Sequence, residues 1–292
     1  MTAGGQEVTR WWPLLGVHGE PTAVHTVAGG ASGAAVHRVT VGGRDVVLKV
    51  ASGPDRQGAG RELRFYRELA HRVPVLVPKL LAGVEHADGT CLLLESAGAA
   101  PTRWSWVDLA AELGGLHRNR PAAWSWVKTP HTATNTELAA AERFWQAQGY
   151  GPLLAPVWST FGSLAAAVAR LPTCLQHGDC HLGNILVDPA DRYVWIDWQE
   201  VGIGHGPEDL ALLWQRAEFN GLTPPREAMR TAYARGRAIP ADATLRMATI
   251  AAELTMLLLS WPFHLLRGAE PARARLLRRL ESLVQSWLAG GQ

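Results

Sequence analysis

The N-terminal third of the chain alternates short apolar runs with glycine-containing turns. Three stretches alternate apolar and polar positions and predict strands: residues 24–28, 35–41 and 45–50. Glycines at 29–33 and 42–43 separate them, as turns between strands require. Residues 59–71 carry apolar side chains at helical spacing, and the apolar run at 92–95 predicts a further strand. We therefore expect a small antiparallel sheet with one helix.

The remainder of the chain has the periodicity of helices. These are expected at residues 106–117, 135–148, 160–169, from 207 onward, 225–235, 241–266 and 271–288. The apolar run 247–266 raises the question of a membrane span, but Glu253, Pro262 and His264 interrupt it, so we interpret it as a buried helix. The pattern predicts an α+β protein with two lobes, residues 1–96 and residues 97–292.

Composition narrows the class of protein. A chain of 292 residues with 47% hydrophobic content is long enough for two lobes with a sizeable core. Its three cysteines are an odd number without framework spacing, and residues 1–16 lack a basic segment followed by an apolar one. We expect a cytoplasmic monomer or weak dimer, with neither a membrane nor a nucleic acid as partner.

Two polar stretches carry the chemistry of the chain. Residues 175–188 read Leu-Gln-His-Gly-Asp-Cys-His-Leu-Gly-Asn-Ile-Leu-Val-Asp, and residues 195–198 read Trp-Ile-Asp-Trp. Asp179 on such a loop can accept the proton of an attacking hydroxyl, while Asn184 and Asp197 can hold Mg²⁺ against nucleotide phosphates. The structural alternative is that Asp179 caps a turn and Asn184 occupies a left-handed bend. Asp179, Asn184 and Asp197 all have the residue types that phosphoryl transfer needs, and each has apolar strand residues beside it. Together they favour phosphoryl transfer over the structural alternative.

His-Gly-Asp together with Ile-Asp-Trp resembles the motifs of the aminoglycoside phosphotransferase and choline-kinase-like family. The spacing Asp-x-x-x-x-Asn is also that of the protein-kinase catalytic loop, with Gly178 where protein kinases carry arginine. The resemblance implies a protein-kinase-like bilobal fold, with Asp179 as the catalytic residue and Asn184 and Asp197 as magnesium ligands. It implies ATP, or GTP, as the phosphoryl donor. Asp209 matches a position that supports the catalytic loop in this family.

The upstream residues fit the same family order. Lys49, near the end of the third predicted strand, resembles the kinase lysine that neutralises the α- and β-phosphates and is oriented by a helix carboxylate. Glu62 is the expected partner, whereas Glu68 is better explained as a surface glutamate paired with an arginine. Glycine loop, strand lysine, helix glutamate and catalytic loop follow one another along the chain, and this order supports the resemblance more than any single residue.

The remaining nucleotide contacts are predicted from loops. Backbone N–H groups at Gly30 and the Ser32 hydroxyl could approach phosphate oxygens, with a plain hairpin turn as an equal alternative. Glu95 and Ala97 follow an apolar strand and are expected at the hinge between lobes. The resemblance places both next to the purine base.

Two further interpretations of the catalytic loop were weighed against phosphoryl transfer. The spacing of Cys174, His177, Cys180 and His181 could suggest zinc. The same loop must already serve the transfer chemistry, so we expect His177 to bond to backbone and steady it. His181 could act as a second base, but Asp179 has the better position by resemblance, so His181 is expected to pack in the loop.

The acceptor is the least specified part of the prediction. A net charge of +2 argues against a highly cationic aminoglycoside, although four glutamates could form an acidic pocket: Glu200, Glu208, Glu218 and Glu227. The thirteen tryptophans offer flat stacking surfaces, with core packing as the alternative. The predicted acceptor contacts are Trp198, Glu200, Trp214, Glu218 and Trp261.

We expect a small-molecule kinase that phosphorylates a hydroxyl of a nucleoside or glycoside antibiotic. Choline-, homoserine- and sugar-type acceptors stay open. A nucleotide-binding module without transfer activity is the second hypothesis, but none of its expected losses is seen at Lys49, Asp179, Asn184 or Asp197. A protein kinase is disfavoured because no Ala-Pro-Glu follows Asp197.

Overall fold

The computed structural model describes residues 3–27, 33–119 and 124–290. Two compact units are present: Met1–Thr102 with Gly183–Val201, and Arg103–Leu182 with Gly202–Gln292. The sequence places a single division after residue 96. In the structure the first unit continues to Thr102 and also takes in a segment that comes much later in the chain.

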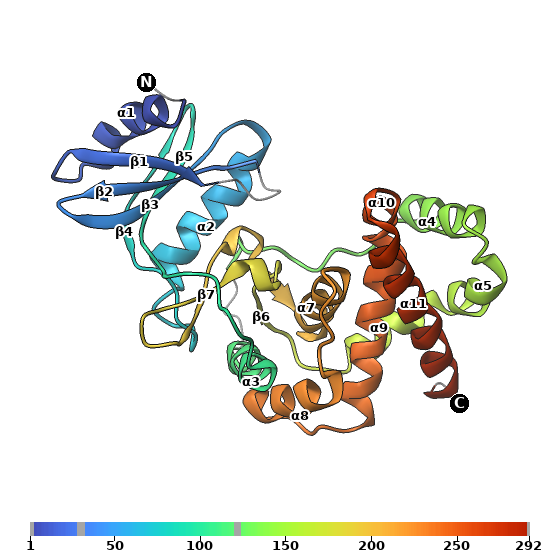
Figure 1. The fold of residues 1–292 in the computed structure, drawn as a ribbon. Helices are drawn as coiled ribbons and strands as arrows, with labels where there is room; N and C mark the ends of the chain where they lie inside the picture. The colour runs from blue at the N-terminus through green and yellow to red at the C-terminus, as the bar shows by residue number, and fades with distance from the viewer. Residues whose placement is uncertain (1–2, 28–32, 120–123, 291–292) are drawn as a thin grey trace. The chain divides into compact units, whose positions relative to one another are not determined.

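The first unit is built on a five-stranded antiparallel sheet in the order β1-β2-β3-β5-β4 (Figure 1). Its strands are β1 (Pro21–Val27), β2 (Ala35–Val41), β3 (Arg44–Ala51), β4 (Leu80–His86) and β5 (Gly89–Glu95). Gly42 and Gly43 form the turn between β2 and β3 with φ values of +56° and +77°, a conformation that glycine adopts without a steric penalty. The antiparallel sheet and the α+β fold class expected from the sequence are confirmed.

Helices cover both faces of this sheet. Side chains alternate along a strand, so Leu48 and Val50 point to one face and Lys49 to the other. Leu48 and Val50 share a core cluster with Trp11 of α1 (Ala3–Leu15), whereas Lys49 contacts α2 (Arg56–Glu68). The sequence did not predict α1, because two glycines near its start and Pro13 within it weaken the helical signal.

A short hairpin completes the first unit. It consists of β7 (Ile185–Val187) and β8 (Tyr193–Trp195), preceded by the 3-10 turn η2 (Leu182–Asn184) and followed by η3 (Trp198–Glu200). Val187 exchanges two backbone hydrogen bonds with Ala99, and the Trp195 N–H donates to the Leu76 carbonyl. These bonds anchor the hairpin to the unit that contains the sheet.

The second unit is mainly helical (Figure 1). Its helices are α3 (Trp106–Leu116), α4 (Asn135–Ala147), α5 (Gly151–Ser159), α6 (Phe161–Val168), α7 (Pro207–Phe219), α8 (Arg226–Arg237), α9 (Ala243–Leu259), α10 (Pro262–Arg267) and α11 (Glu270–Gly290). Strand β6 (Cys174–Gln176) pairs with β9 (Gly202–Gly204). Helix α9 supplies the centre of the core through Leu254, Leu257 and Leu258.

The apolar run expected as one helix at 241–266 is two helices. Helix α9 ends at Leu259 and Pro262 stands at the start of α10, where its missing N–H costs no helical hydrogen bond. Within the described part of the chain, no single helix has the length and apolarity of a membrane span. The bent pair α5 and α6 meets that test only when its two helices are taken together.

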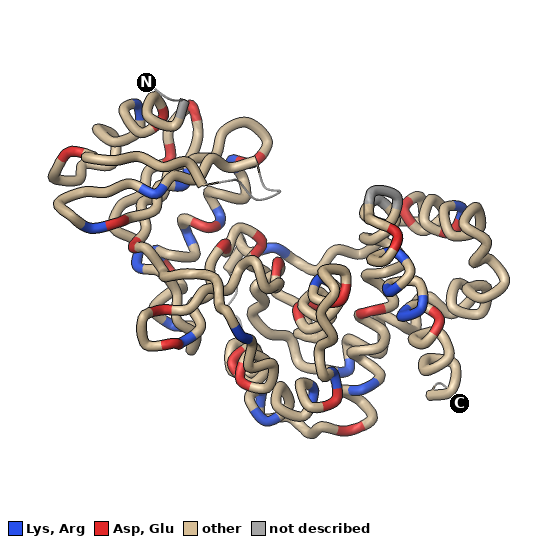
Figure 2. The backbone as a smooth tube through the Cα atoms, viewed as in Figure 1, with Lys and Arg blue, Asp and Glu red and all other residues tan. Residues whose placement is uncertain are grey.

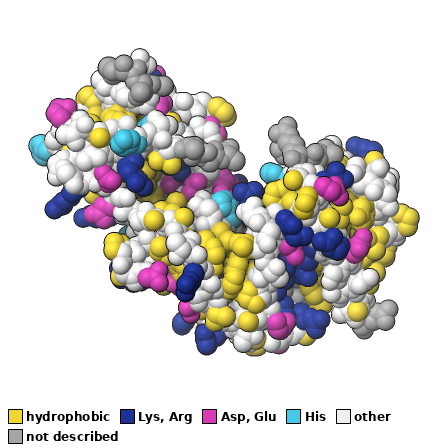
Figure 3. Space-filling model, viewed as in Figure 1, with side chains coloured by type: hydrophobic (Ala, Val, Ile, Leu, Met, Phe, Trp, Pro, Cys, Tyr) yellow, Lys and Arg dark blue, Asp and Glu magenta, His cyan; other side chains and the backbone are white. Residues whose placement is uncertain are grey.

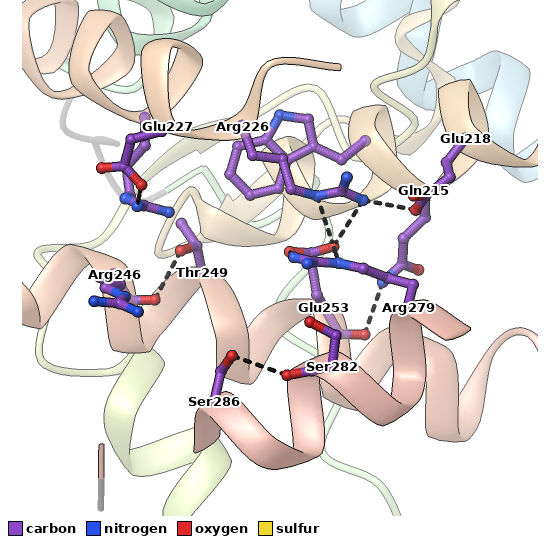
Figure 4. Close-up of polar contacts among 12 residues, drawn as sticks. Gln215, Glu218, Arg226, Glu227, Arg246, Thr249, Glu253, Arg279, Ser282 and Ser286 are labelled. Carbon is purple, nitrogen blue, oxygen red and sulfur yellow. Dashed lines mark hydrogen bonds and ion pairs between the residues drawn. The ribbon is translucent and has the colours of Figure 1, made fainter. Parts of the chain in front are cut away.

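A buried ionic network joins four helices of the second unit (Figure 4). Glu253 of α9 is 1% exposed, and its carboxylate accepts from Arg226 of α8 at 3.3 Å and from Arg279 of α11 at 2.5 Å. Arg226 also pairs with Glu218 at the end of α7, at 2.8 Å. The side-chain amide of Gln215 donates to the Glu253 carbonyl. The network fixes the C-terminal end of α7 against α8, α9 and α11.

Replacing Glu253 by glutamine should destabilise this unit strongly. The amide keeps the side-chain volume but leaves two largely buried guanidinium groups without their shared anion, which costs about 3–5 kcal/mol. Chemical denaturation should show this loss in the free energy of unfolding. Glu227→Gln is the control, because the Glu227 side chain is 82% exposed where it pairs with Arg230. Equal losses in the two variants would contradict the role given to the buried network.

Candidate active site

Three charged side chains meet in the first unit. The Lys49 ammonium on β3 donates to the Glu62 carboxylate on α2 at 2.6 Å and to the Asp197 carboxylate at 2.7 Å. Lys49 is 7% exposed and Glu62 is 1% exposed. The structure therefore joins Lys49 with the glutamate favoured by the sequence, whereas Glu68 pairs with Arg64 on the surface of α2.

The balance of charge in this cluster favours an added cation. Burial by itself lowers the pKa of Lys49, but the Glu62 and Asp197 carboxylates outweigh it and raise that pKa, so the ammonium stays charged. Burial raises the pKa of Glu62, and the Lys49 charge opposes that rise. Two carboxylates share one ammonium. The Asp197 side chain is the more exposed of the two carboxylates, at 23%, and is the one available to a further cation.

The β7–β8 hairpin brings Asn184 and Asp197 to the same end. Ile185 is paired with Trp195, and just beyond this pair the Ile196 N–H donates to the Asn184 carbonyl at 3.0 Å. Asp197 follows in a left-handed conformation with φ +65° and ψ +64°. Aspartate tolerates this region better than most residues, and such conformations concentrate at functional sites.

The donor set at this end of the hairpin fits Mg²⁺. A carboxylate and an amide oxygen are hard ligands, and Mg²⁺ usually takes one or two protein oxygens and completes its shell with water and substrate phosphates. Nearby, the Tyr66 hydroxyl is buried and has no hydrogen-bond partner within the described residues. Burial raises the pKa of Tyr66, and the negative charges of Glu62 and Asp197 raise it further. The hydroxyl therefore keeps its proton and can donate a hydrogen bond.

Helix α2 is fastened to the segment that follows Asp197. Phe65 stacks on Trp198 with ring centroids 4.0 Å apart and planes within 8°. The Arg61 guanidinium donates to the Gln199 carbonyl and lies 3.8 Å from the Glu200 carboxylate. Glu62 and Asp197 are therefore held by one packed assembly. Phe65 and Arg61 were not among the predicted site residues, although an aromatic residue one turn after Glu62 is a signal for Phe65.

In the second unit, Asp209 holds the backbone of the predicted catalytic loop, which follows β6 at residues 177–181. It lies in the first turn of α7, and its carboxylate accepts from the His177 N–H at 2.7 Å and the Gly178 N–H at 2.9 Å. The His117 ring nitrogen Nε2 lies 3.1 Å from the same carboxylate. The supporting position implied by the family resemblance is thus filled by a buried aspartate with three donors.

Asp179 follows these two held amides directly. Its own N–H donates to His177 Nδ1 at 3.3 Å, which is the backbone contact expected of that histidine. The Asp179 side chain is 32% exposed and lies 3.5 Å from His181 Nε2. A loop held by its backbone leaves this carboxylate accessible to a substrate.

The cysteines of the loop lie in the core. Cys174 and Cys180 are buried, and burial raises the pKa of both thiols, which disfavours the thiolate that zinc binds. Within the described ranges no group of three or more His, Cys, Asp or Glu side chains has the arrangement of a metal site.

The predicted acceptor tryptophans are core residues in this structure. Trp198 and Trp214 are fully buried and Trp261 is 2% exposed. Trp198 stacks on Phe65, and the Trp214 indole N–H donates to the Met229 sulfur. An indole without exposed surface offers no face to a ligand, so the structure corrects their assignment as acceptor contacts in favour of core packing.

The two acidic residues predicted as acceptor contacts each pair with an arginine of their own unit. Glu200 lies in the first unit beside Arg61, whereas Glu218 lies in the second and pairs with Arg226. Acidic and basic residues are spread along both units (Figure 2), and the visible surface mixes both signs with apolar side chains (Figure 3). Each of these glutamates has a cationic partner, so neither is a preformed site for a polycation.

Of the four nucleotide contacts predicted from loops, the structure describes two, Glu95 and Ala97. Gly30 and Ser32 lie outside the described residues. Glu95 is exposed at the end of β5 and its N–H donates to the Lys79 carbonyl. After Ala97, Gly98 adopts φ +113°, and a Cβ there would lie 1.9 Å from the Val187 carbonyl oxygen. Only glycine fits at Gly98, so the segment after β5 is held against the β7–β8 hairpin.

Comparison with known proteins identifies the family. The model of the phosphotransferase enzyme family matches residues 23–248, most of the chain. Among curated proteins, none shows significant similarity to this sequence.

Solved structures resemble the fold over nearly the whole chain. The GDP complex of wild-type aminoglycoside 2′-phosphotransferase-IIIa superimposes with a TM-score of 0.67 at 14% identity, covering 98% of this chain and 99% of its own. Aminoglycoside phosphotransferase APH(3″)-Id from Streptomyces rimosus, in complex with ADP and streptomycin, gives 0.55 at 21% identity, covering 85% and 98%. Spectinomycin phosphotransferase APH(9)-Ia, with ADP and spectinomycin, gives 0.56 at 14% identity, covering 99% of each chain. At these identities the likeness shows a protein-kinase-like fold.

Proposed function

This chain belongs to the phosphotransferase enzyme family, and we propose that it transfers the γ-phosphoryl group of ATP or GTP to a hydroxyl of a small antibiotic-like molecule. The observation that carries the proposal is the contact of Lys49 with both Glu62 and Asp197. A buried ammonium oriented by one carboxylate, beside a second carboxylate that can take a metal, is the arrangement that positions nucleotide phosphates.

The residues of the first unit would bind and orient the nucleotide. Lys49 neutralises phosphate oxygens while Glu62 holds its ammonium in place. Asn184 and Asp197 would hold Mg²⁺, which when bound neutralises the charge on the phosphates. Glu95 and Ala97 are proposed neighbours of the purine, and Gly30 and Ser32 of the phosphates.

Asp179 would act on the acceptor. Its carboxylate accepts a hydrogen bond from the acceptor hydroxyl, aims that oxygen at the γ-phosphorus and takes its proton as the new bond forms. The bond to the β,γ-bridging oxygen breaks, and the nucleoside diphosphate leaves. Positioning and charge stabilisation supply most of the catalysis.

We propose a nucleoside or glycoside antibiotic as acceptor, rather than a highly cationic aminoglycoside. The net charge of +2 and the paired state of Glu200 and Glu218 support this choice. Two structural neighbours are complexes with streptomycin and with spectinomycin, which supports an antibiotic acceptor, with resistance as the proposed biological role. A choline-, homoserine- or sugar-type metabolite is the second candidate, and a nucleotide-binding module without transfer activity is the third.

A substrate panel tests the proposal. The protein is incubated with Mg²⁺, ATP or GTP, and separate nucleoside, peptide and aminoglycoside antibiotics and hydroxylated metabolites, and the products are analysed by mass spectrometry. We expect one added phosphoryl group on a weakly charged antibiotic, with Mg²⁺ required. Phosphorylation of choline, homoserine or a sugar alone would replace the antibiotic acceptor. Tight nucleotide binding without any product would favour the module that lacks transfer activity.

A further inference from the structure

A chain of buried hydrogen bonds extends from Asp209 to the end of α8. The Arg237 guanidinium contacts the Tyr233 hydroxyl at 3.1 Å, this hydroxyl contacts His117 Nδ1 at 2.8 Å, and His117 Nε2 contacts the Asp209 carboxylate at 3.1 Å. All four residues belong to the second unit, and none is more than 4% exposed. This series of hydrogen bonds therefore ends at the Asp209 carboxylate, which holds the loop at His177 and Gly178.

The direction of each hydrogen bond follows from what each group can donate. A guanidinium only donates, so the Tyr233 oxygen accepts from Arg237. The fully buried phenol proton then needs an acceptor, and His117 Nδ1 is the one within reach. Burial raises the pKa of Tyr233, so the phenol keeps this proton. A neutral His117 therefore carries its proton on Nε2, where it donates to Asp209.

Arg237 also ties together the strands that lead into the loop. Its guanidinium donates to the Pro172 carbonyl at 2.6 Å and to the His205 carbonyl at 2.6 Å. Pro172 lies just before β6 and His205 just after β9, so Arg237 holds one end of the β6–β9 pair. Asp209 holds the loop that leaves the other end of β6. Burying a guanidinium whose hydrogen-bond partners are neutral costs free energy. We therefore interpret Arg237 as a residue that holds these segments in position.

The backbone near Asp209 is shaped around this chain of hydrogen bonds. Gly206 precedes α7 with φ +97°, and a Cβ there would lie 2.3 Å from the Tyr233 hydroxyl oxygen and 2.8 Å from His117 Nδ1. Gly114 of α3 likewise lets α8 approach, because a Cβ there would lie 2.3 Å from the Tyr233 carbonyl. At both positions a larger residue would displace the hydrogen-bonded residues Tyr233 and His117.

We propose that Tyr233 and Arg237 are positioning residues of the phosphoryl-transfer site. Through His117 they fix the Asp209 carboxylate, which in turn holds the His177 and Gly178 amides and so orients Asp179. Neither residue contacts substrate. The inference rests on the proposed function for its effect on catalysis, but its effect on the loop can be measured without any acceptor.

Tyr233→Phe tests the proposal, because it removes only the hydroxyl. Hydrogen exchange of the peptide covering residues 174–182 should become about tenfold faster, since the Asp209 contact to the loop amides loosens. With an accepted substrate, kcat should fall about tenfold while KM for the nucleotide changes less than twofold, because misplaced groups cost rate rather than nucleotide binding. Arg237→Lys should show the same pattern and serves if Tyr233→Phe does not fold.

Arg235→Lys is the matched control. Arg235 is exposed and lies between Tyr233 and Arg237 on α8, so the substitution should change neither loop exchange nor kcat. Wild-type loop exchange in Tyr233→Phe, or the same acceleration in Arg235→Lys, would overturn the inference. Absence of transfer by the wild-type protein would count against the proposed function, and the exchange result would still decide whether Tyr233 positions the loop.

Discussion

Replacing Asp179 by asparagine should lower kcat for phosphoryl transfer by about 10²–10⁴-fold, the range that general-base groups contribute. The amide keeps the size of the side chain but cannot take the proton of the acceptor hydroxyl. KM for the nucleotide should stay close to wild type, because Lys49, Asn184 and Asp197 are unchanged. Steady-state kinetics with the acceptor found in the panel measures both constants.

His181→Asn is the companion variant for Asp179→Asn. His181 lies 3.5 Å from the Asp179 carboxylate and is a second base on the same loop. If Asp179 is the catalytic residue, His181→Asn keeps most of the activity. A loss as deep as that of Asp179→Asn would give the proton-accepting role to His181 instead.

Replacing Asp197 by asparagine is the second change with a large expected effect. The carboxylate contacts Lys49 at 2.7 Å, and Asp197 lies at the same end of the β7–β8 hairpin as Asn184. Metal stabilisation of the transferring group is worth several kcal/mol, so kcat should fall about 10³-fold. Calorimetry should show that Mg²⁺ no longer strengthens nucleotide binding. Binding without Mg²⁺ should be retained, because Lys49 loses one carboxylate partner and its ammonium stays available to the phosphates.

Asp188→Asn controls for a change of charge in the same hairpin. Asp188 pairs with Arg192 at 2.7 Å and has no contact with the Lys49 cluster in the described structure. It should leave both kcat and the Mg²⁺ effect on binding unchanged. If Asp197→Asn retains Mg²⁺-dependent binding at wild-type strength, the metal is held by other residues.

The local part of the fold and the contact between Lys49 and Glu62 could be predicted from the sequence. Turn glycines such as Gly42 and the period-two runs define β2 and β3 directly. The roles predicted for Asp179 and Asn184 rest on the family resemblance of the Asp-x-x-x-x-Asn spacing, and they stay predictions. Glu62 could be chosen over Glu68 because it comes earlier in the predicted helix 59–71, where the family resemblance puts the lysine's partner.

The rest depends on contacts between distant segments. Whether a tryptophan is buried is decided by what packs on it, so Trp198 and Trp214 read alike as acceptor contacts or as core. Tyr233 and Arg237 lie on α8, whose many charged residues indicate a surface helix, and nothing in their spacing shows that both reach inward. Helix α1 was missed for a local reason, since its glycines and Pro13 mask an apolar stripe.

Our central proposal is that Lys49, Asp197 and Asp179 each take part in phosphoryl transfer. A single-turnover experiment with ATP labelled at the γ-phosphate, Mg²⁺ and the acceptor tests it most directly, with wild-type protein and Asp179→Asn side by side. The expected result is label on the acceptor hydroxyl with the wild-type protein, and transfer reduced at least about 10²-fold in the variant. Equal transfer by both proteins, or nucleotide binding without transfer to any acceptor, would contradict the claim.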